Sequence, residues 1–254
     1  MPDAALPVIT PRGAKIEPSA GAPFEAVRVA RDVLHTSRTA ALATLDPVSG
    51  YPYTTATNIG IEPDGTPFFF AAGLTLHARN MEADPRISLT LAPFGKGDAL
   101  TLSRLTLVGK VELIDPNDVP LARQRYIDRY PKAKLYLSLP DTRFYRLRTQ
   151  GVQINGGPAR NASNITPADL RTDLSGAEQL MAAAAAEAAR LNAIKGEASR
   201  LAVLAGAKTG RWTITSIDPD GIDLASTNDL ARLWFEERVT TLKQLEKALA
   251  QPLK

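Results

Sequence analysis

The segment from Thr75 to Asn80 places four kinds of polar side chain within six positions. Thr75, His77, Arg79 and Asn80 supply a hydroxyl, an imidazole, a guanidinium and an amide. All four groups can donate hydrogen bonds, and a guanidinium can bind a phosphate through two parallel bonds. The spacing therefore suits an anion such as a phosphate monoester, although similar clusters also occur at solvated helix starts.

The elements around this segment are predicted to be short strands. Residues 54–61 mix β-branched and small residues, and Asp64-Gly65 is a strong hairpin turn because glycine accepts a positive φ. Residues 68–70 are three phenylalanines, which could be core or could face a ligand. The strand then ends in Ala71-Ala72-Gly73, whose small side chains let a flat ligand approach the backbone. Asp84-Pro85-Arg86 turns the chain into a strand over residues 87–91.

Composition narrows the function classes. The chain has 254 residues, 44% hydrophobic and 22% charged, with a net charge of +3, which is ordinary for a globular protein. Its basic residues are dispersed, which disfavours nucleic-acid binding. It has no cysteine, which excludes disulfides, thiolate metal sites and cysteine nucleophiles. Without a long apolar run or a signal layout, we expect a soluble, cytoplasmic protein.

Hydrophobic periodicity predicts the remaining elements of a first domain. We expect a helix from Pro23 to near Thr36, a strand over Thr39–Leu45, and one long or two shorter strands from Ala99 to Ile114, with Gly109 as a bulge or corner. A helix over residues 119–130 and strands over residues 141–148 and 151–155 follow.

A change of composition at residues 166–175 predicts a second domain. The expected elements are helices over residues 176–191 and 197–204, strands over 212–217, 222–225 and 230–235, and a helix over 242–250. The predicted organisation is a flexible N-terminus (1–21), a first domain (22–165) and a small C-terminal domain (166–254).

Several motifs resemble one known family. Leu74, His77 and Asn80 form L-x-x-H-x-x-N, residues 84–89 form D-P-R-x-S-L, and residues 38–44 form R-x-A-x-L-A-T. These motifs resemble the pyridoxamine 5'-phosphate oxidase-like FMN-binding split barrels, and in particular their HugZ-type haem-utilisation branch. The resemblance implies an α+β fold: an antiparallel split β-barrel followed by a small α/β C-terminal domain.

The C-terminal sequence also resembles the small domain of that branch, with two departures from the pattern. The residues that fit it are Trp212, Ile217, Asp218, Pro219, Gly221, Asp223, Leu224, Arg232, Leu233, Phe235 and Val239. The usual H-M-N-x-D-H motif is replaced by residues 190–195, RLNAIK, so both histidines are missing. The glycine-rich segment before the boundary reads Gly156-Gly157-Pro158-Ala159-Arg160, where Pro158 removes a backbone donor.

The resemblance implies an FMN-binding protein, expected to be a flavin-dependent oxidoreductase and a homodimer with the flavin in a groove between subunits. On that template the phosphate would be held by Thr75, His77, Arg79 and Asn80, and the ring would be lined by Thr55, Thr57 and Asn58. Arg104 would meet flavin oxygens or the phosphate. Its alternatives are a pair with Glu112 or a place on the outer face of its strand.

Two alternatives stay open. A haem-binding or haem-degrading protein of the HugZ type would fill the same groove with porphyrin, with Arg79 and Arg160 near the propionates and His77 as the candidate iron ligand. The other histidine, His35, lies near the end of a predicted helix and is expected to be structural or on the surface. A cofactor-free binding protein on the same fold is the third possibility. No other metal site is predicted.

Overall fold

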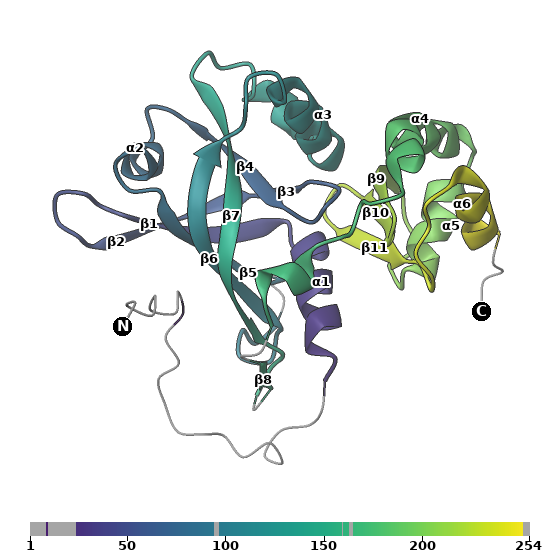
Figure 1. The fold of residues 1–254 in the computed structure, drawn as a ribbon, viewed down its shortest axis with the longest axis horizontal. Helices are drawn as coiled ribbons and strands as arrows, with labels where there is room; N and C mark the ends of the chain where they lie inside the picture. The colour runs from purple at the N-terminus through teal and green to yellow at the C-terminus, as the bar shows by residue number, and fades with distance from the viewer. Residues whose placement is uncertain (1–8, 10–23, 94–96, 159, 163–164, 251–254) are drawn as a thin grey trace. The chain divides into compact units, whose positions relative to one another are not determined.

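The computed structural model describes residue 9 and residues 24–93, 97–158, 160–162 and 165–250, and divides into two compact units (Figure 1). The first unit comprises the chain up to Ile59, Pro67–Asp115 and Leu139–Leu170. The second comprises Gly60–Thr66, Pro116–Ser138 and the chain from Arg171. We expected the domain boundary after residue 165, and the last stretch of the first unit ends at Leu170. The sequence did not indicate that residues 60–66 and 116–138 belong to the second unit. Apart from Ile9, the segment 1–21 that we predicted to be flexible lies outside the described residues.

The first unit is built on an antiparallel sheet with the strand order β2-β1-β5-β6-β7-β4, and a short β8 pairs with β7. Buried and partly exposed residues alternate along β1 and β5, so one face of the sheet carries the core. This architecture confirms the predicted split-barrel fold. The strands are β1 (Thr39–Leu45), β2 (Pro52–Asn58), β4 (Pro67–Ala72), β5 (Arg86–Leu91), β6 (Arg104–Leu113), β7 (Thr142–Asn155) and β8 (Asn161–Ala162).

Helices α1 (Ala26–Thr36) and α2 (Leu76–Ala83) and the 3-10 turn η3 (Pro167–Leu170) complete the first unit. Helix α1 is amphipathic and packs against β6 and β7, burying Ala30, Val33 and Leu34. His35, in its last turn, is only 1% exposed. His35 is therefore a core residue and is not accessible to a ligand.

Strands β6 and β7 are each continuous and are joined through a β-bulge. The register shifts between Val108 and Gly109, because Val108 pairs with Gly151 and Gly109 with Thr149. The irregularity expected at Gly109 is therefore present, but the extra residue is Gln150 on β7, opposite Gly109. A Cβ atom at Gly109 would lie 2.1 Å from the carbonyl oxygen of Arg148, so no side chain fits there. The two strands expected over residues 141–155 are thus one bulged strand, and the strand expected from Ala99 begins only at Arg104.

The second unit packs helices against a three-stranded antiparallel sheet of order β11-β10-β9. Its core includes Leu180 and Leu191 from α4, Leu201 from α5, and Ile222 and Leu224 from β10. The elements are β3 (Gly60–Ile61), α3 (Val119–Arg129), the 3-10 turn η2 (Pro131–Leu135), α4 (Glu178–Ala193), α5 (Glu197–Leu204), β9 (Thr213–Asp218), β10 (Gly221–Ala225), β11 (Leu230–Trp234) and α6 (Leu242–Leu249).

A buried ion network explains much of the C-terminal motif. Arg232, whose side chain is 0% exposed, donates from Nη1 and Nη2 to the two carboxylate oxygens of Asp218 at 2.8 and 2.7 Å, and from Nη1 to Asp223 at 2.8 Å. Its guanidinium carbon lies 4.1 Å from the centre of the Trp234 ring. A Cβ atom at Gly221 would lie 2.4 Å from a backbone oxygen and 3.2 Å from this guanidinium, so glycine is required.

Asn192 is the asparagine retained within the replaced histidine motif, and it protects the edge of this sheet. Its amide donates to the carbonyl oxygen of Ile214 at 2.9 Å and accepts from the Ile214 N–H at 2.8 Å. Strand β9 is an edge strand, whose free backbone groups could otherwise pair with another chain. Asn192 therefore has a structural role that does not depend on the missing histidines.

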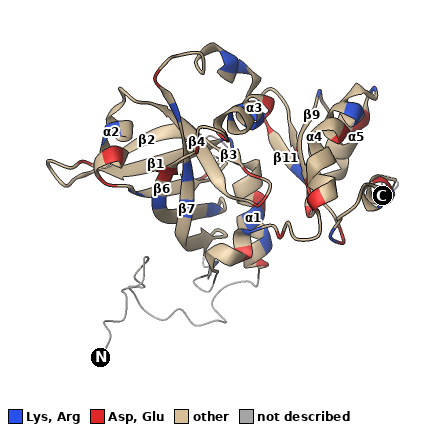
Figure 2. Ribbon diagram, turned by 45° about the horizontal axis from the view of Figure 1, so that its top comes forward, with Lys and Arg blue, Asp and Glu red and all other residues tan. Residues whose placement is uncertain are grey.

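Lysines and arginines are distributed over helices and strands of both units (Figure 2). This dispersal agrees with the absence of basic runs in the sequence. Within the described parts of the chain, no helix is long and apolar enough to cross a membrane.

Candidate functional site

The loop that leads into α2 is tied to the start of β7. The Gly73 N–H donates to the carbonyl oxygen of Asp141 at 3.0 Å, and the Leu74 N–H donates to the Asp141 carboxylate at 3.3 Å. Thr75 is the N-cap residue of the helix but its side chain does not cap it. The start of α2 is therefore fixed by contacts outside the helix.

Two side chains of α2 also bind it to the sheet. Asn80, only 1% exposed, donates from Nδ2 to the hydroxyl of Thr44 on β1 at 3.0 Å. Glu82 forms an ion pair with Arg143 on β7. A Cβ atom at Gly73 would lie 3.2 Å from the Arg143 guanidinium, so the two groups are closely packed. Asn80, which we assigned to a phosphate, thus uses its amide to hold the helix against β1.

Thr75 and His77 are in direct contact at the start of α2. The Thr75 hydroxyl donates its proton to the carbonyl oxygen of Ala72 at 2.7 Å. Toward Nε2 of His77, 3.2 Å away, this hydroxyl can act only as an acceptor. Nε2 of His77 therefore carries a proton and Nδ1 holds the lone pair. Partial burial lowers the pKa of His77 below its ordinary value of 6.5, so the imidazole is neutral at pH 7.

Free backbone donors and exposed apolar side chains lie beside this pair. The first N–H groups of a helix have no intrahelical acceptor, and those of Leu76, His77 and Ala78 have no acceptor among the described residues. Leu74 and Leu76 are 76% and 47% exposed. The start of α2 thus combines anion-binding donors, an apolar surface and a neutral imidazole.

The remaining predicted site residues lie on β2, α2 and β6. Thr55 and Thr57 pair with Leu42 and Ala40 on the core side of the sheet, whereas Asn58 pairs with Thr39 and points to the opposite face. Arg79 is exposed on α2, near the Thr75–His77 contact in the chain.

Arg104 is the first residue of β6 and lies next to Leu105, which pairs with Leu91 at the end of β5. Helix α2 precedes Arg86, at the opposite end of β5. The Arg104 guanidinium donates to the carbonyl oxygen of Ala99. The possible pair with Glu112 is wrong, because Glu112 binds Arg148 at 2.6 Å and lies 3.7 Å from Arg146. Within one chain, therefore, Arg104 does not reach the start of α2.

The glycine-rich segment closes on itself. The Gly156 N–H donates to the carbonyl oxygen of Arg160 at 2.7 Å, and the Arg160 N–H to that of Gly157 at 3.1 Å. The Gly157 N–H binds the side chain of Asn155 at 2.9 Å. These backbone donors are already used, in agreement with the reduced donor capacity expected from Pro158. Ala159 lies outside the described residues.

Sequence reasoning missed the residues that position α2. Asp141, Glu82 and Arg143 carried no motif, and Arg143 lies 61 positions from its partner. The glycine at position 73, which we read only as a place for a flat ligand to approach, is the one local sign of the close guanidinium. Among the described residues, no three His, Cys, Asp or Glu side chains gather as metal ligands would.

Comparisons with known structures relate both units to other proteins. The crystal structure of the protein Atu2129, of unknown function, from Agrobacterium tumefaciens str. C58 is 83% identical, with a TM-score of 0.89 over 98% of this chain and 100% of that one. A haem-binding protein from Mycobacterium smegmatis is 25% identical, with a TM-score of 0.54, covering 90% of this chain and 96% of that chain.

A curated plant protein and a family model match the first part of the chain. The non-canonical heme oxygenase HOZ, chloroplastic, of Arabidopsis thaliana is 28% identical over 130 residues, which are 51% of this chain and 40% of the plant protein. The chain thus matches less than half the length of that relative. The model "CREG, beta-barrel" matches residues 22–162, more than half of this chain. On the strength of that match and of its split-barrel sheet, the chain belongs to the CREG β-barrel family.

Proposed function

We propose that this protein binds haem at the start of α2. The observation that carries the proposal is the neutral, half-buried His77 imidazole beside exposed Leu74 and Leu76 and three backbone N–H groups that have no acceptor in the described part of the chain. Haem has an apolar ring that the leucines would cover, carboxylates that accept from N–H groups, and an iron that takes neutral imidazole. His35 is buried, so His77 is the accessible imidazole of the chain.

The comparisons favour haem over flavin, which reverses the order suggested by the sequence. The M. smegmatis protein is described as haem-binding and matches both units. HOZ is described as a haem oxygenase and matches the barrel. Haem, when bound, would supply the redox chemistry of its iron, and the protein's own residues would bind and orient it.

The contact between Thr75 and His77 affects how haem could bind to His77. Nε2 of His77 is held by the Thr75 hydroxyl, so binding of haem iron through Nε2 would require this contact to break and the ring proton to move to Nδ1. Replacing Thr75 by valine removes the competing acceptor while keeping the shape. Thr75→Val should therefore raise the affinity for haem.

Flavin is the second candidate, and the free N–H groups at the start of α2 favour it. A helix N-terminus binds phosphate through such groups. Of the other residues proposed for the flavin, Thr55, Thr57 and Asn58 lie on β2, whereas Arg104 does not reach this point within one chain. A flavin contact from Arg104 would therefore require a homodimer in which a second subunit completes the groove. The protein would then be an FMN-dependent oxidoreductase, with the flavin carrying the electrons.

Absorption titrations of the purified protein with haemin and with FMN test both candidates. We expect a haem Soret band that is lost in His77→Phe, and tighter haem binding in Thr75→Val. The matched control is Thr101→Val, because the Thr101 hydroxyl also donates to the carbonyl three residues earlier, at 2.8 Å, in an exposed loop. Weaker FMN binding in Thr75→Val, with a haem band that does not depend on His77, would favour the flavin. If neither haemin nor FMN changes the absorption spectrum, the result would favour a cofactor-free binding protein.

The pH dependence gives an independent check. Because burial lowers the pKa of His77 below its ordinary value of 6.5, the neutral imidazole predominates at pH 7 and takes up a proton as the pH falls below 6.5. Haem affinity should be constant between pH 8 and 7 and fall below pH 6.5. Affinity that already falls between pH 8 and 7 would contradict the assignment of His77.

A further inference from the structure

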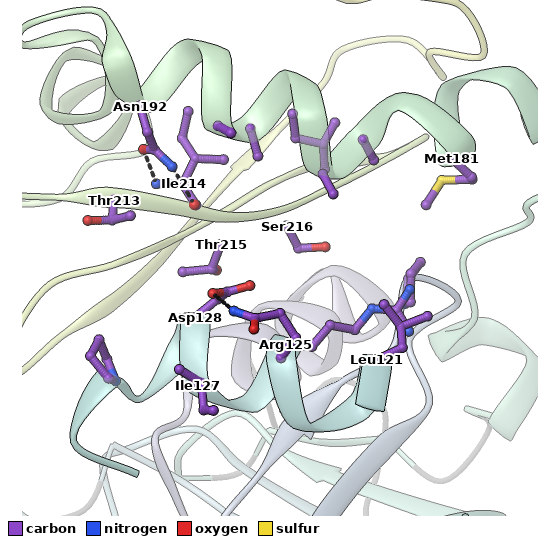
Figure 3. A pocket seen from close by; sticks show the side chains of 18 of the residues that line it. Leu121, Arg125, Ile127, Asp128, Met181, Asn192, Thr213, Ile214, Thr215 and Ser216 are labelled. Carbon is purple, nitrogen blue, oxygen red and sulfur yellow. Dashed lines mark hydrogen bonds between the residues drawn. The ribbon is translucent and has the colours of Figure 1, made fainter. Parts of the chain in front are cut away.

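The second unit contains a cavity of about 540 Å³ lined by α3, α4 and β9. Figure 3 shows Met181 and Asn192 of α4, residues Thr213 to Ser216 of β9, and Leu121, Arg125 and Asp128 of α3 around it. Its volume lies in the range of small-molecule sites, roughly 300–1,000 Å³. The cavity belongs to the second unit, whereas the start of α2 belongs to the first.

Small side chains on α4 leave space between the walls of the cavity, and an ion pair fixes the position of α3 on the opposite side. Helix α4 turns alanines toward the cavity, among them Ala185 and Ala189, which are exposed. On the opposite wall, the buried Arg129 of α3 lies 3.9 Å from the Asp223 carboxylate on β10. The cavity is thus a preformed apolar slot, since its two sides are fixed independently of any ligand.

Asp128 is the polar group that an occupant would cover. One of its carboxylate oxygens accepts from Gln124 at 2.7 Å, and the other has no partner among the described residues. Surrounding protein raises the pKa of Asp128, because partial burial penalises the charged form, although Gln124 and Lys134 oppose this shift. A ligand that covered this carboxylate without a donor would leave it unsatisfied.

The other charges facing the cavity are the cations Arg125 and Lys134. Lys134 is exposed to solvent. We propose that this cavity binds a small apolar molecule ending in an amine, with its apolar body against the alanines of α4 and its ammonium on Asp128.

The test uses the full-length protein and two probes of the same apolar shape, 1-aminoadamantane and adamantane-1-carboxylate, with binding measured by calorimetry. The amine should bind, and Asp128→Asn should weaken it about tenfold or more, as expected for a lost charged hydrogen bond. Ala185→Leu should abolish binding by filling the slot. Ala186→Leu, at a neighbouring exposed alanine that does not line the cavity, should leave binding unchanged.

Leucine keeps the helix propensity of α4, and Ala189→Leu repeats the test at a second lining position. Unchanged tryptophan fluorescence would show that the variants remain folded. The proposal is overturned if the amine does not bind, if both leucine variants at lining positions still bind it, or if the carboxylate probe binds more tightly than the amine.

Discussion

Replacing Arg232 by methionine should destabilise the second unit by about 3–5 kcal/mol, the usual effect of removing one partner from a buried ion pair. The change deletes three hydrogen bonds of 2.7–2.8 Å to Asp218 and Asp223. It leaves two carboxylates whose side chains are 1% and 6% exposed. Burial by itself would lower the pKa of Arg232, but the charges of Asp223 and Asp218 raise it above its usual range. The guanidinium is therefore charged, and Arg232→Met removes a positive charge from the buried network.

Guanidinium chloride unfolding followed by tryptophan fluorescence measures this effect. The sequence contains two tryptophans, Trp212 and Trp234, and both belong to the second unit. The emission therefore reports on that unit. Arg190→Met is the control, because Arg190 is exposed and pairs with Glu187 one helical turn away at 2.5 Å, which predicts a change of at most about 0.5 kcal/mol.

A second comparison separates the charge from the shape of the site. The Nε group of Arg232 is buried without a hydrogen-bond partner among the described residues, which already weakens the network. Combining Arg232→Met with Asp218→Asn removes one buried charge pair and leaves Asp223 beside Arg129, 3.9 Å away, so it should recover part of the lost stability. A loss below about 1 kcal/mol in Arg232→Met, or no recovery in the double variant, would refute this account of the network.

Three further predictions concern single contacts. Asn192→Ala removes two hydrogen bonds to the β9 backbone and should cost about 1–3 kcal/mol in the same unfolding assay, with more self-association as the strand edge opens. The Asp84 carboxyl should titrate near 2 by NMR, because the side chain and N–H of Arg86 donate to it, and return toward 3.8 in Arg86→Ala; the stabilisation is present above pH 3.8 and is lost as the pH falls through about 2. Gly109→Ala should unfold the barrel or shift its strands by circular dichroism, because the new Cβ has no room beside Arg148, and a stable variant would contradict the bulge.

Local sequence patterns predicted most of the fold. Thr39–Leu45 and Glu197–Leu204 form the strand and helix that alternation and helical periodicity indicated. Gly109 marked the point on β6 that lies opposite the bulge of β7. The continuity of β7 was missed because a bulge leaves the strand intact but breaks its alternation, so one strand looks like two.

The candidate site could be predicted only in part, because side-chain partners depend on distant residues. The motif identified the start of α2, but the four polar residues have different roles there. Thr75 and His77 meet, Arg79 is exposed, and Asn80 is committed to β1. No local pattern distinguishes a buried amide from a ligand-binding one, since that depends on a threonine 36 positions away.

The second unit is assembled from three separate stretches of the chain, which has a consequence for its synthesis. Helix α3 is synthesised after β3 but well before β9, against which it also packs. Its contact from Arg129 to the Asp223 carboxylate can therefore form only once the C-terminal segment has been synthesised. A product terminated after the barrel would keep this helix without β9 and without Asp223.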